Sequence, residues 1–252
     1  MLFDRHFSRV TKLLPWLTMA AFLFAAPMWA EQPTQLSFEP GKLYEVALFK
    51  ISPGKEMEIQ QRYFSKAFPL AQSYGMRPVG TFSVTQIEHG PDDVATWGFF
   101  EWPSLEVKKR FERDAEFRKL RPIRDSLVET LRLVYLEVQE PFTVDMKSDR
   151  MYEFYGGWVN RTRAAHLQEY FAVAGPWVGE RGVRFLGEFS ILGSPDGYRF
   201  LPDTVGFIEW PSKKVKEAWF ASDEFKQVGF HRALAIDRLV VIESRFDFPE
   251  GP

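Results

Sequence analysis

The hexapeptide FFEWPS at residues 99–104 returns as FIEWPS at residues 207–212, which places Glu101 and Glu209 in equivalent positions 108 residues apart. The likeness extends well beyond these six residues. Matched pairs on either side include Tyr44-Glu45 with Tyr152-Glu153, Tyr63-Phe64 with Tyr170-Phe171, Pro69 with Pro176, Gly98 with Gly206, and Glu116-Phe117 with Glu224-Phe225. Self-similarity at one spacing marks a structural unit that is used twice, so we predict a tandem duplication of about a hundred residues.

Within each copy the hydrophobic periodicity changes in one fixed order. In the first copy, strand-like residues 43–51 precede a stretch at 56–74 whose apolar residues fall at helical spacing. Two strands, a second helical stripe and a closing strand follow, which is the β-α-β-β-α-β order of a ferredoxin-like unit. Pro69 and Pro176 should kink or interrupt the first helix of each copy. The predicted boundaries are a signal peptide at 1–30, a linker at 31–41, repeat 1 at 42–140, a linker at 141–149, repeat 2 at 150–247 and a tail at 248–252.

Both copies resemble the dimeric α+β barrel superfamily. The segments KISPGKEMEIQQRYF, VATWGFFEWPS and FERDAEF of the first copy are most similar to its NIPSNAP-like members, as is IEWPSKKVKEAWFASDEF of the second. In that superfamily two ferredoxin-like sheets face each other and close into a barrel, usually between subunits. The resemblance therefore implies an α+β fold in which two tandem ferredoxin-like repeats form a pseudo-dimeric barrel within one chain.

The sheets have a strongly apolar surface, because Phe99, Phe100, Phe207 and Ile208 occupy both faces of the third strand of each copy. A face of this kind has to be covered, and packing the two sheets against each other would cover it. The space between them is a natural cavity, so we predict that it binds a small hydrophobic or aromatic ligand. The alternative is a barrel filled by its own side chains, which would make the protein a structural or interaction module. The 25 Phe and 8 Trp residues are enough to fill such a barrel.

Two histidines distinguish the copies, since His166 and His231 stand where the first copy has Ile59 and Ile123. Several members of the superfamily bind haem through a helix histidine. The resemblance thus makes His231 a candidate axial ligand and His166 a weaker one, and it suggests an oxidative enzyme as an alternative function. That enzyme would be haem-dependent or a cofactor-free monooxygenase. The commoner role of such a histidine is a hydrogen-bonded one at the edge of the core.

Three further residues are candidates for lining the cavity. Glu101 and Glu209 interrupt apolar strands, and a buried carboxylate has the raised pKa that acid-base chemistry uses. Their alternative role is pairing with arginines of a neighbouring strand, Arg132 and Arg238. Tyr155 precedes two glycines, which leave room in a strand for a ligand or a close neighbour. The lysine-rich segments 107–119 and 211–217 are assigned to solvated helix faces.

The N-terminus and the composition narrow the remaining possibilities. Arg5, Arg9 and Lys12 precede an apolar run at 13–30, which predicts an export signal cleaved near Ala30 and a periplasmic or secreted protein without a lasting membrane anchor. The absence of cysteine excludes a thiol enzyme and a cysteine metal site. A formal net charge of −2 argues against nucleic acid as a partner. No metal-binding motif is present, and further association of the pseudo-dimer is left open.

Overall fold

The computed structural model describes residues 34–90, 94–195, 197–198 and 200–248. The first half of the barrel begins with a strand and ends with a strand, with helices after the first and third strands. Its elements are β2 (Leu43–Ile51), α1 (Glu56–Ile59), the π-helical turn η1 (Gln60–Phe64), α2 (Ser65–Ser73), β3 (Arg77–His89), β4 (Thr96–Trp102), α3 (Leu105–Arg113), α4 (Ala115–Asp125) and β5 (Val128–Glu137).

The second half repeats this order, except that its second strand is broken in two. Its elements are β7 (Met151–Val159), α5 (Ala165–Glu180), β8 (Arg184–Phe185), β9 (Ser190–Gly193), β10 (Thr204–Trp210), α6 (Lys213–Ala221), α7 (Asp223–Ala235) and β11 (Ile236–Phe246). The predicted pair of ferredoxin-like repeats is confirmed.

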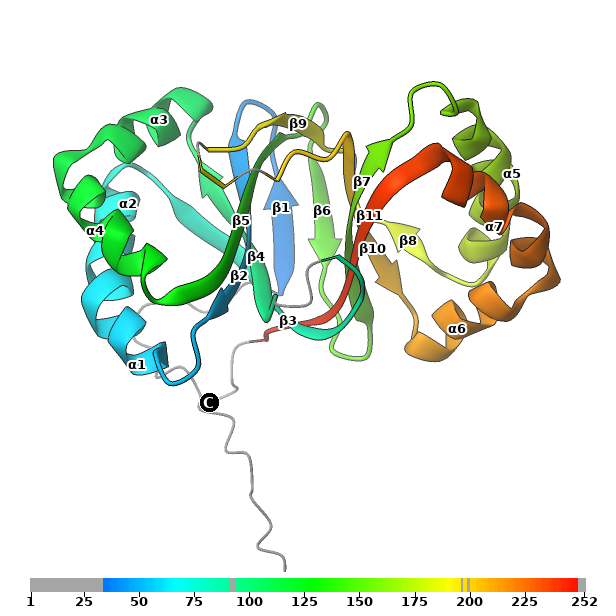
Figure 1. Cartoon of the computed structure of the whole chain (residues 1–252), viewed down its shortest axis with the longest axis horizontal. Coiled ribbons are helices and arrows are strands. Elements are labelled where there is room, and N and C mark those ends of the chain that lie inside the picture. Colours follow the sequence, from blue (N-terminus) through cyan, green and yellow to red (C-terminus); the bar gives the residue numbers. More distant parts are fainter. Residues whose placement is uncertain (1–33, 91–93, 196, 199, 249–252) are drawn as a thin grey trace, which may run out of the picture.

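Nine strands form one continuous sheet in the order β8-β10-β7-β11-β3-β4-β2-β5-β9. The halves are joined twice, by β3 against β11 and by β5 against β9. Because β8 and β9 follow each other in the chain, these two ends of the sheet lie close together and the sheet curves into a barrel. Figure 1 shows α1 to α4 covering one flank and α5 to α7 covering the other. The predicted intrachain α+β barrel is thus confirmed.

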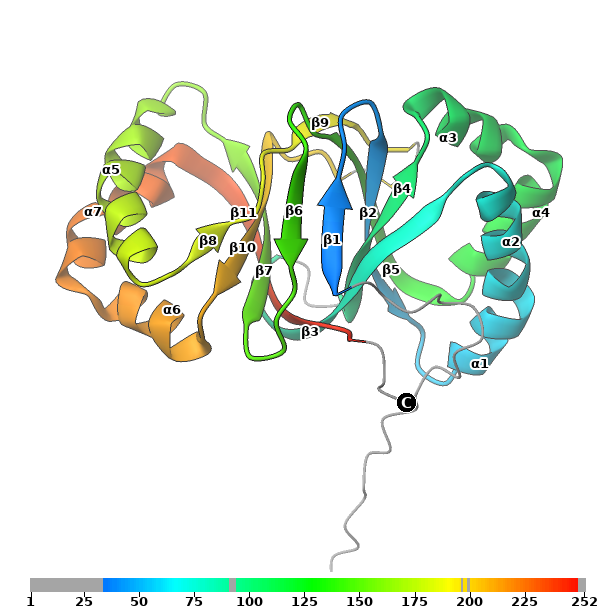
Figure 2. The same ribbon diagram turned by 180° about the vertical axis from the view of Figure 1, so that it is seen from behind.

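Two short strands that the sequence assigns to linkers lie across one side of this barrel, with one face directed to its interior. β1 (Gln35–Phe38) pairs antiparallel with β6 (Phe142–Asp145), and Figure 2 shows the two side by side between the halves. Alternate residues of β1 are buried, so the strand presents Leu36 and Phe38 to the interior. Residues 35–38 and 142–145, which the sequence assigns to linkers, are therefore strands, and this pair of strands plugs the barrel.

Aromatic side chains occupy the rest of the interior. The rings of Phe99 and Phe207, one from each half, lie 4.5 Å apart, and Phe38 stacks on Phe142 at 4.7 Å. The space left between these side chains is about 20 Å³, close to the volume of one water molecule. Among the residues that the structure describes, side chains of the protein itself therefore fill the space between the two sheets in which the sequence predicts a ligand cavity.

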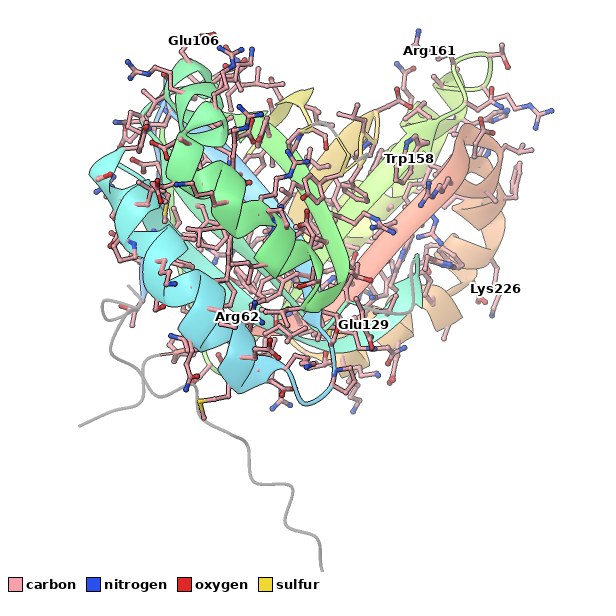
Figure 3. All side chains as sticks on the ribbon, turned by 60° about the vertical axis from the view of Figure 1, so that its left-hand side comes forward. Arg62, Glu106, Glu129, Trp158, Arg161 and Lys226 are labelled. Carbon is pink, nitrogen blue, oxygen red and sulfur yellow. The ribbon has the colours of Figure 1, made fainter. Side chains whose placement is uncertain are left out.

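Several local predictions can be checked against the helices. Ser104 and Ser212 cap α3 and α6, each accepting a hydrogen bond from the backbone N–H three residues later. The helices continue past Pro69 and Pro176, so neither proline ends its helix. Along the described ranges, the helices are too short or too polar to span a bilayer. The predicted export signal at 1–30 lies outside those ranges. Charged side chains such as Glu106, Arg161 and Lys226 occupy the periphery (Figure 3).

Candidate functional site

Each half contains a cavity between the outer face of its sheet and the helices that cover it. The first cavity lies under α2, α3 and α4 and measures about 110 Å³. The second cavity lies between β7, β10, β11 and α5, α6, α7, and measures about 210 Å³. Equivalent residues line both, among them Tyr63 and Tyr170, and Trp102 and Trp210. The two halves therefore offer a direct comparison of one site in two versions.

The larger volume of the second cavity follows from substitutions in the first strand of the repeat. Phe49 lines the first cavity, whereas Gly157 holds the equivalent position in the second and has no side chain to fill it. Tyr155 lines the second cavity where the first has Ala47. Its ring lies directly against Gly206, where a Cβ would be only 2.3 Å from the ring atoms. Tyr155 is thus in a cavity, as the sequence predicts, but on the helix side of the sheet.

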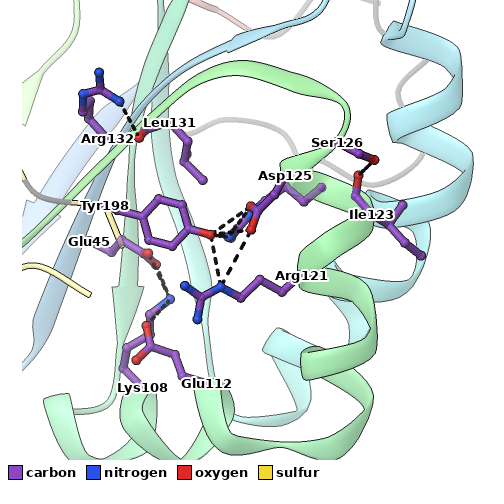
Figure 4. Close-up of polar contacts among 11 residues, drawn as sticks. Glu45, Lys108, Glu112, Arg121, Ile123, Asp125, Ser126, Leu131, Arg132 and Tyr198 are labelled. Atoms are coloured by element: carbon purple, nitrogen blue, oxygen red, sulfur yellow. Dashed lines mark hydrogen bonds and ion pairs between the residues drawn. The ribbon is translucent and has the colours of Figure 1, made fainter. Parts of the chain in front are cut away.

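In the first half, a buried lysine, a carboxylate and an indole satisfy one another. Lys108 Nζ lies 2.9 and 2.8 Å from the two carboxylate oxygens of Glu45, and above the ring of Trp102 at 4.4 Å. Trp102 Nε1 donates to Glu45 Oε2 at 3.0 Å. Figure 4 shows Lys108 between Glu45 and Glu112. These polar atoms are already paired within the protein and are not directed at a ligand.

In the second half, the equivalent lysine is surrounded by three carboxylates. Lys216 Nζ lies 2.5 Å from Glu153 Oε2, 2.9 Å from Glu243 Oε1 and 3.0 Å from Glu88 Oε2. Glu88 comes from β3 of the first half and is partly exposed, whereas Lys213 approaches Glu243 at 3.8 Å from the surface. The cluster therefore connects Glu153, on the floor of the second cavity, with solvent.

The ionisation of this cluster is set by burial and by Lys216. Burial raises the pKa of Glu153, although the charge of Lys216 acts in the opposite direction. Burial would also raise the pKa of Glu243, but the hydrogen bond and charge of Lys216, together with Glu88 and Lys213, outweigh it and lower this pKa. Burial alone would lower the pKa of Lys216, and its carboxylate partners raise it instead. Of the two buried carboxylates, Glu153 is thus the one that more readily holds a proton.

Trp210 differs from its counterpart in having an unpaired indole N–H. Its Nε1 is buried and has no hydrogen-bond partner among the described residues, whereas Trp102 Nε1 is bonded to Glu45. A buried donor without a partner costs about 1–3 kcal/mol. Trp210 lines the second cavity, so an oxygen of a bound molecule could accept this hydrogen bond.

The sequence candidates Glu101 and Glu209 lie away from both cavities. Glu101 accepts from Arg77 at 2.7 Å, and Glu209 accepts from Arg184 at 3.1 Å. Each arginine stands directly across the sheet from its glutamate. These carboxylates are therefore cross-strand ion pairs, which is the alternative role that the sequence suggests.

Their partners differ from those expected. Arg132 instead donates to the backbone carbonyl of Leu131 at 3.2 Å, and the guanidinium of Arg238 lies over the ring of Trp158 at 4.3 Å. The arginines that pair with the two glutamates belong to the second strand of each repeat, not to the fourth.

His166 and His231 meet each other at the contact between α5 and α7. Their Nδ1 atoms are 2.8 Å apart, and Phe230 packs on the ring of His231 at 4.0 Å. Neither histidine lines the second cavity, whose volume is also below the roughly 300–1,000 Å³ of pockets for larger ligands. This arrangement does not fit His231 as a haem axial ligand, because the residue lies outside the wall of a cavity that is itself below the volume of pockets for larger ligands.

Two lysines are buried against the expectation from the sequence. The charge pattern predicts solvated helix faces for Lys108 and Lys216, but their exposed fractions are 4% and 2%. A signal was present, because both copies place a lysine four residues after the capping serine and a glutamate after the first-strand tyrosine. A charged pair that recurs at equivalent positions of two copies is a candidate for burial.

Comparison with known proteins identifies the fold. No family model and no curated protein sequence matches the chain. Among solved structures, an anthrone oxidase-like protein superposes with a TM-score of 0.53 at 17% identity, covering 84% of this chain and 94% of its own. A mutant chlorite dismutase from Candidatus Nitrospira defluvii gives a TM-score of 0.50 at 12% identity, covering 82% and 92%.

The chain has the dimeric α+β barrel fold. The likeness to the anthrone oxidase-like protein and to the chlorite dismutase extends over both halves. At these identities it establishes the architecture, and the function has to be argued from the site.

Proposed function

We propose that the second cavity binds a small, mostly apolar aromatic molecule that carries an oxygen acceptor. The observation that carries this proposal is the buried, unpaired N–H of Trp210 in the wall of that cavity. Aromatic rings line the remaining wall, among them Tyr155, Tyr170 and Trp219. Such walls favour a planar ring, while the single donor fixes its orientation.

The volume of the cavity limits the ligand to a small molecule. A dry cavity of roughly 150 Å³ in a protein core takes up benzene. The second cavity, at about 210 Å³, therefore suits a molecule of one or two fused rings. Phe171 and Phe185 line it and remain 45% and 49% exposed, so they mark a side from which a ligand can enter.

Titration with 2-naphthol, followed by calorimetry, tests the proposal. We expect binding to the wild-type protein and its loss in Gly157→Phe, which gives the second cavity the phenylalanine of the first. Phe49→Ala in the first half is the matched control and should leave binding unchanged. Absence of heat with the wild-type protein, or equal affinity in Gly157→Phe, would overturn the proposal.

A second candidate function is oxidation of the bound molecule by dioxygen without a cofactor. The observation that favours it is Glu153, a buried carboxyl with a raised pKa on the cavity floor, connected through Lys216 to the partly exposed Glu88. A raised pKa makes the carboxylate a stronger base. The fold is also that of a solved anthrone oxidase-like protein.

In this reaction Glu153 would remove a proton from a ring-activated methylene group. The electron pair of that C–H bond then forms a C–O bond to dioxygen, and the proton returns to the distal oxygen as a hydroperoxide. Loss of water leaves a carbonyl, so that R₂CH₂ and O₂ give R₂C=O and H₂O. Oxygen uptake with 2-indanone, a two-ring compound with such a methylene group, measures the reaction, and Glu153→Gln should slow it by about 100-fold or more. Unchanged uptake in that variant would eliminate Glu153 as the base.

We derive no haem-dependent step, because neither His166 nor His231 lines the second cavity. Appearance of a Soret band on haem titration, altered in His231→Ala, would reverse this conclusion. We also propose that the two halves arose by duplication of a NIPSNAP-like unit and that the protein is exported. Equivalent roles of Ser104 and Ser212, and of Lys108 and Lys216, support the duplication.

A further inference from the structure

Arg232 is the cationic side chain in the wall of the second cavity. It projects from α7, is half-buried, and lies 5.5–5.8 Å from the centres of three aromatic rings, those of Tyr170, Phe220 and Phe225. The only acidic residue described in the same wall is Glu153, which is already paired with Lys216. The cavity therefore combines aromatic walls with a positive charge.

In the first half, the equivalent arginine has a purely structural role. Arg124, the equivalent residue, lies over Tyr63 and Phe117 at 5.7 and 6.0 Å, which are the counterparts of Tyr170 and Phe225. Its Nη2 is 2.9 Å from the carboxylate of Asp125 and also donates to the hydroxyl of Tyr198. Figure 4 shows Tyr198 reaching Asp125. Arg124 is thus neutralised within the protein.

The second half keeps the rings but lacks the counterion. Ala233 stands at the position equivalent to Asp125. Within the described part of the chain, no carboxylate lies close enough to Arg232 to form an ion pair. The same framework thus holds a neutralised arginine over the smaller cavity and an arginine without a counterion in the larger one.

We propose that Arg232 recognises an anionic group, a carboxylate or phenolate, on the aromatic molecule bound in the second cavity. This inference rests on the proposed binding function and narrows its ligand to an anionic aromatic compound. A guanidinium offers paired N–H donors that match a carboxylate, and these charge-assisted bonds strengthen where surrounding rings exclude water. The unpaired Trp210 N–H supplies a further donor in the same cavity.

The test compares two probes of nearly equal shape, 2-naphthoate and 2-naphthamide, by calorimetry at neutral pH. We expect the wild-type protein to bind the carboxylate at least tenfold more tightly than the amide. Arg232→Gln should abolish this preference while keeping the affinity for the amide. Ala233→Asp should do the same with the guanidinium intact, because it supplies the counterion of the first half. Ala233 is exposed, so this variant should fold normally.

Arg124→Gln in the first half is the matched control and should leave the preference unchanged. If both probes bind equally well to the wild-type protein, or if neither second-half variant reduces the preference, the role of Arg232 is overturned while the cavity remains a binding site. If neither probe binds, the proposed function fails together with this inference.

Discussion

Lys216 Nζ lies 2.5 Å from Glu153 Oε2, and both side chains are almost completely buried. The ammonium group also contacts Glu243 and Glu88, so one positive charge is shared by three carboxylates that come from both halves of the chain. Glu153 is therefore an ionisable group at the floor of the second cavity, and Lys216 links it to Glu88 in β3 of the first half.

Replacing Lys216 by methionine should destabilise the protein strongly. The substitution leaves buried carboxylates without their cation, and breaking a buried ion pair from one side typically costs about 3–5 kcal/mol. Urea denaturation at pH 7 measures this loss of unfolding free energy. The loss should shrink at lower pH, because the carboxylates then become neutral. A cost below about 1 kcal/mol at pH 7 would show that the cluster is not buried in solution.

The raised pKa of Glu153 predicts a specific pH dependence. Between its ordinary value of 4.5 and the higher folded-state pKa, the folded protein binds more protons than the unfolded chain at this group. Its contribution to stability is therefore present below pH 4.5 and lost as the pH rises through the folded pKa. Relative to Glu153→Gln, the wild-type protein should lose stability as the pH rises above this value. Thermal denaturation of both proteins over a pH series tests the trend, and an opposite slope would contradict it.

The two equivalent tryptophans should respond differently to loss of their N–H. Trp102→Phe removes the hydrogen bond to the buried carboxylate of Glu45 and should cost about 1.5–3 kcal/mol beyond the change in packing. Trp210→Phe removes no internal hydrogen bond, so it should cost less than its counterpart. Chemical denaturation of the two variants side by side gives the difference. Equal costs would mean that Trp210 Nε1 has a partner in solution.

Gly206 should not tolerate alanine while Tyr155 keeps its position. A Cβ would lie 2.3 Å from the tyrosine ring, and overpacking of this kind costs roughly 1–3 kcal/mol. Tyr155→Ala in the same chain should relieve most of the strain, so the two substitutions should be strongly non-additive in a double-mutant cycle. Additive costs would place the ring elsewhere.

The fold was accessible from the sequence because the repeat and the change of periodicity agree in each copy. The 108-residue spacing of Glu101 and Glu209 identifies equivalent strands, and the strand predicted at residues 43–51 has the same bounds in the structure. The plug was missed for a physical reason. β1 and β6 are four residues long, and such short alternations are common in loops; only the apolar interior of the barrel makes them strands.

The candidate site was located on the wrong face of the sheet. Phe99 and Phe207 fill the interior, whereas Phe100 and Ile208 point to the helices, so apolar residues on both faces gave no indication of where space remained. Tyr155 lines the cavity on the helix side, not the space between the sheets where the sequence predicts it, and Gly206 leaves the room that its ring occupies. Arg232 was missed, since its significance lies in a missing counterion at Ala233 that only the spatial comparison with Asp125 reveals.

The plug formed by β1 and β6 separates cohesion of the two halves from ligand binding, which a hollow barrel would have to combine in one space. Because connecting strands already occupy the central volume, cohesion of the two halves does not depend on a guest molecule. Substitutions beneath α5 and α7 can therefore reshape the second cavity without disturbing the seams at β3–β11 and β5–β9. The second half can therefore acquire a new cavity lining while the first half keeps the original packing.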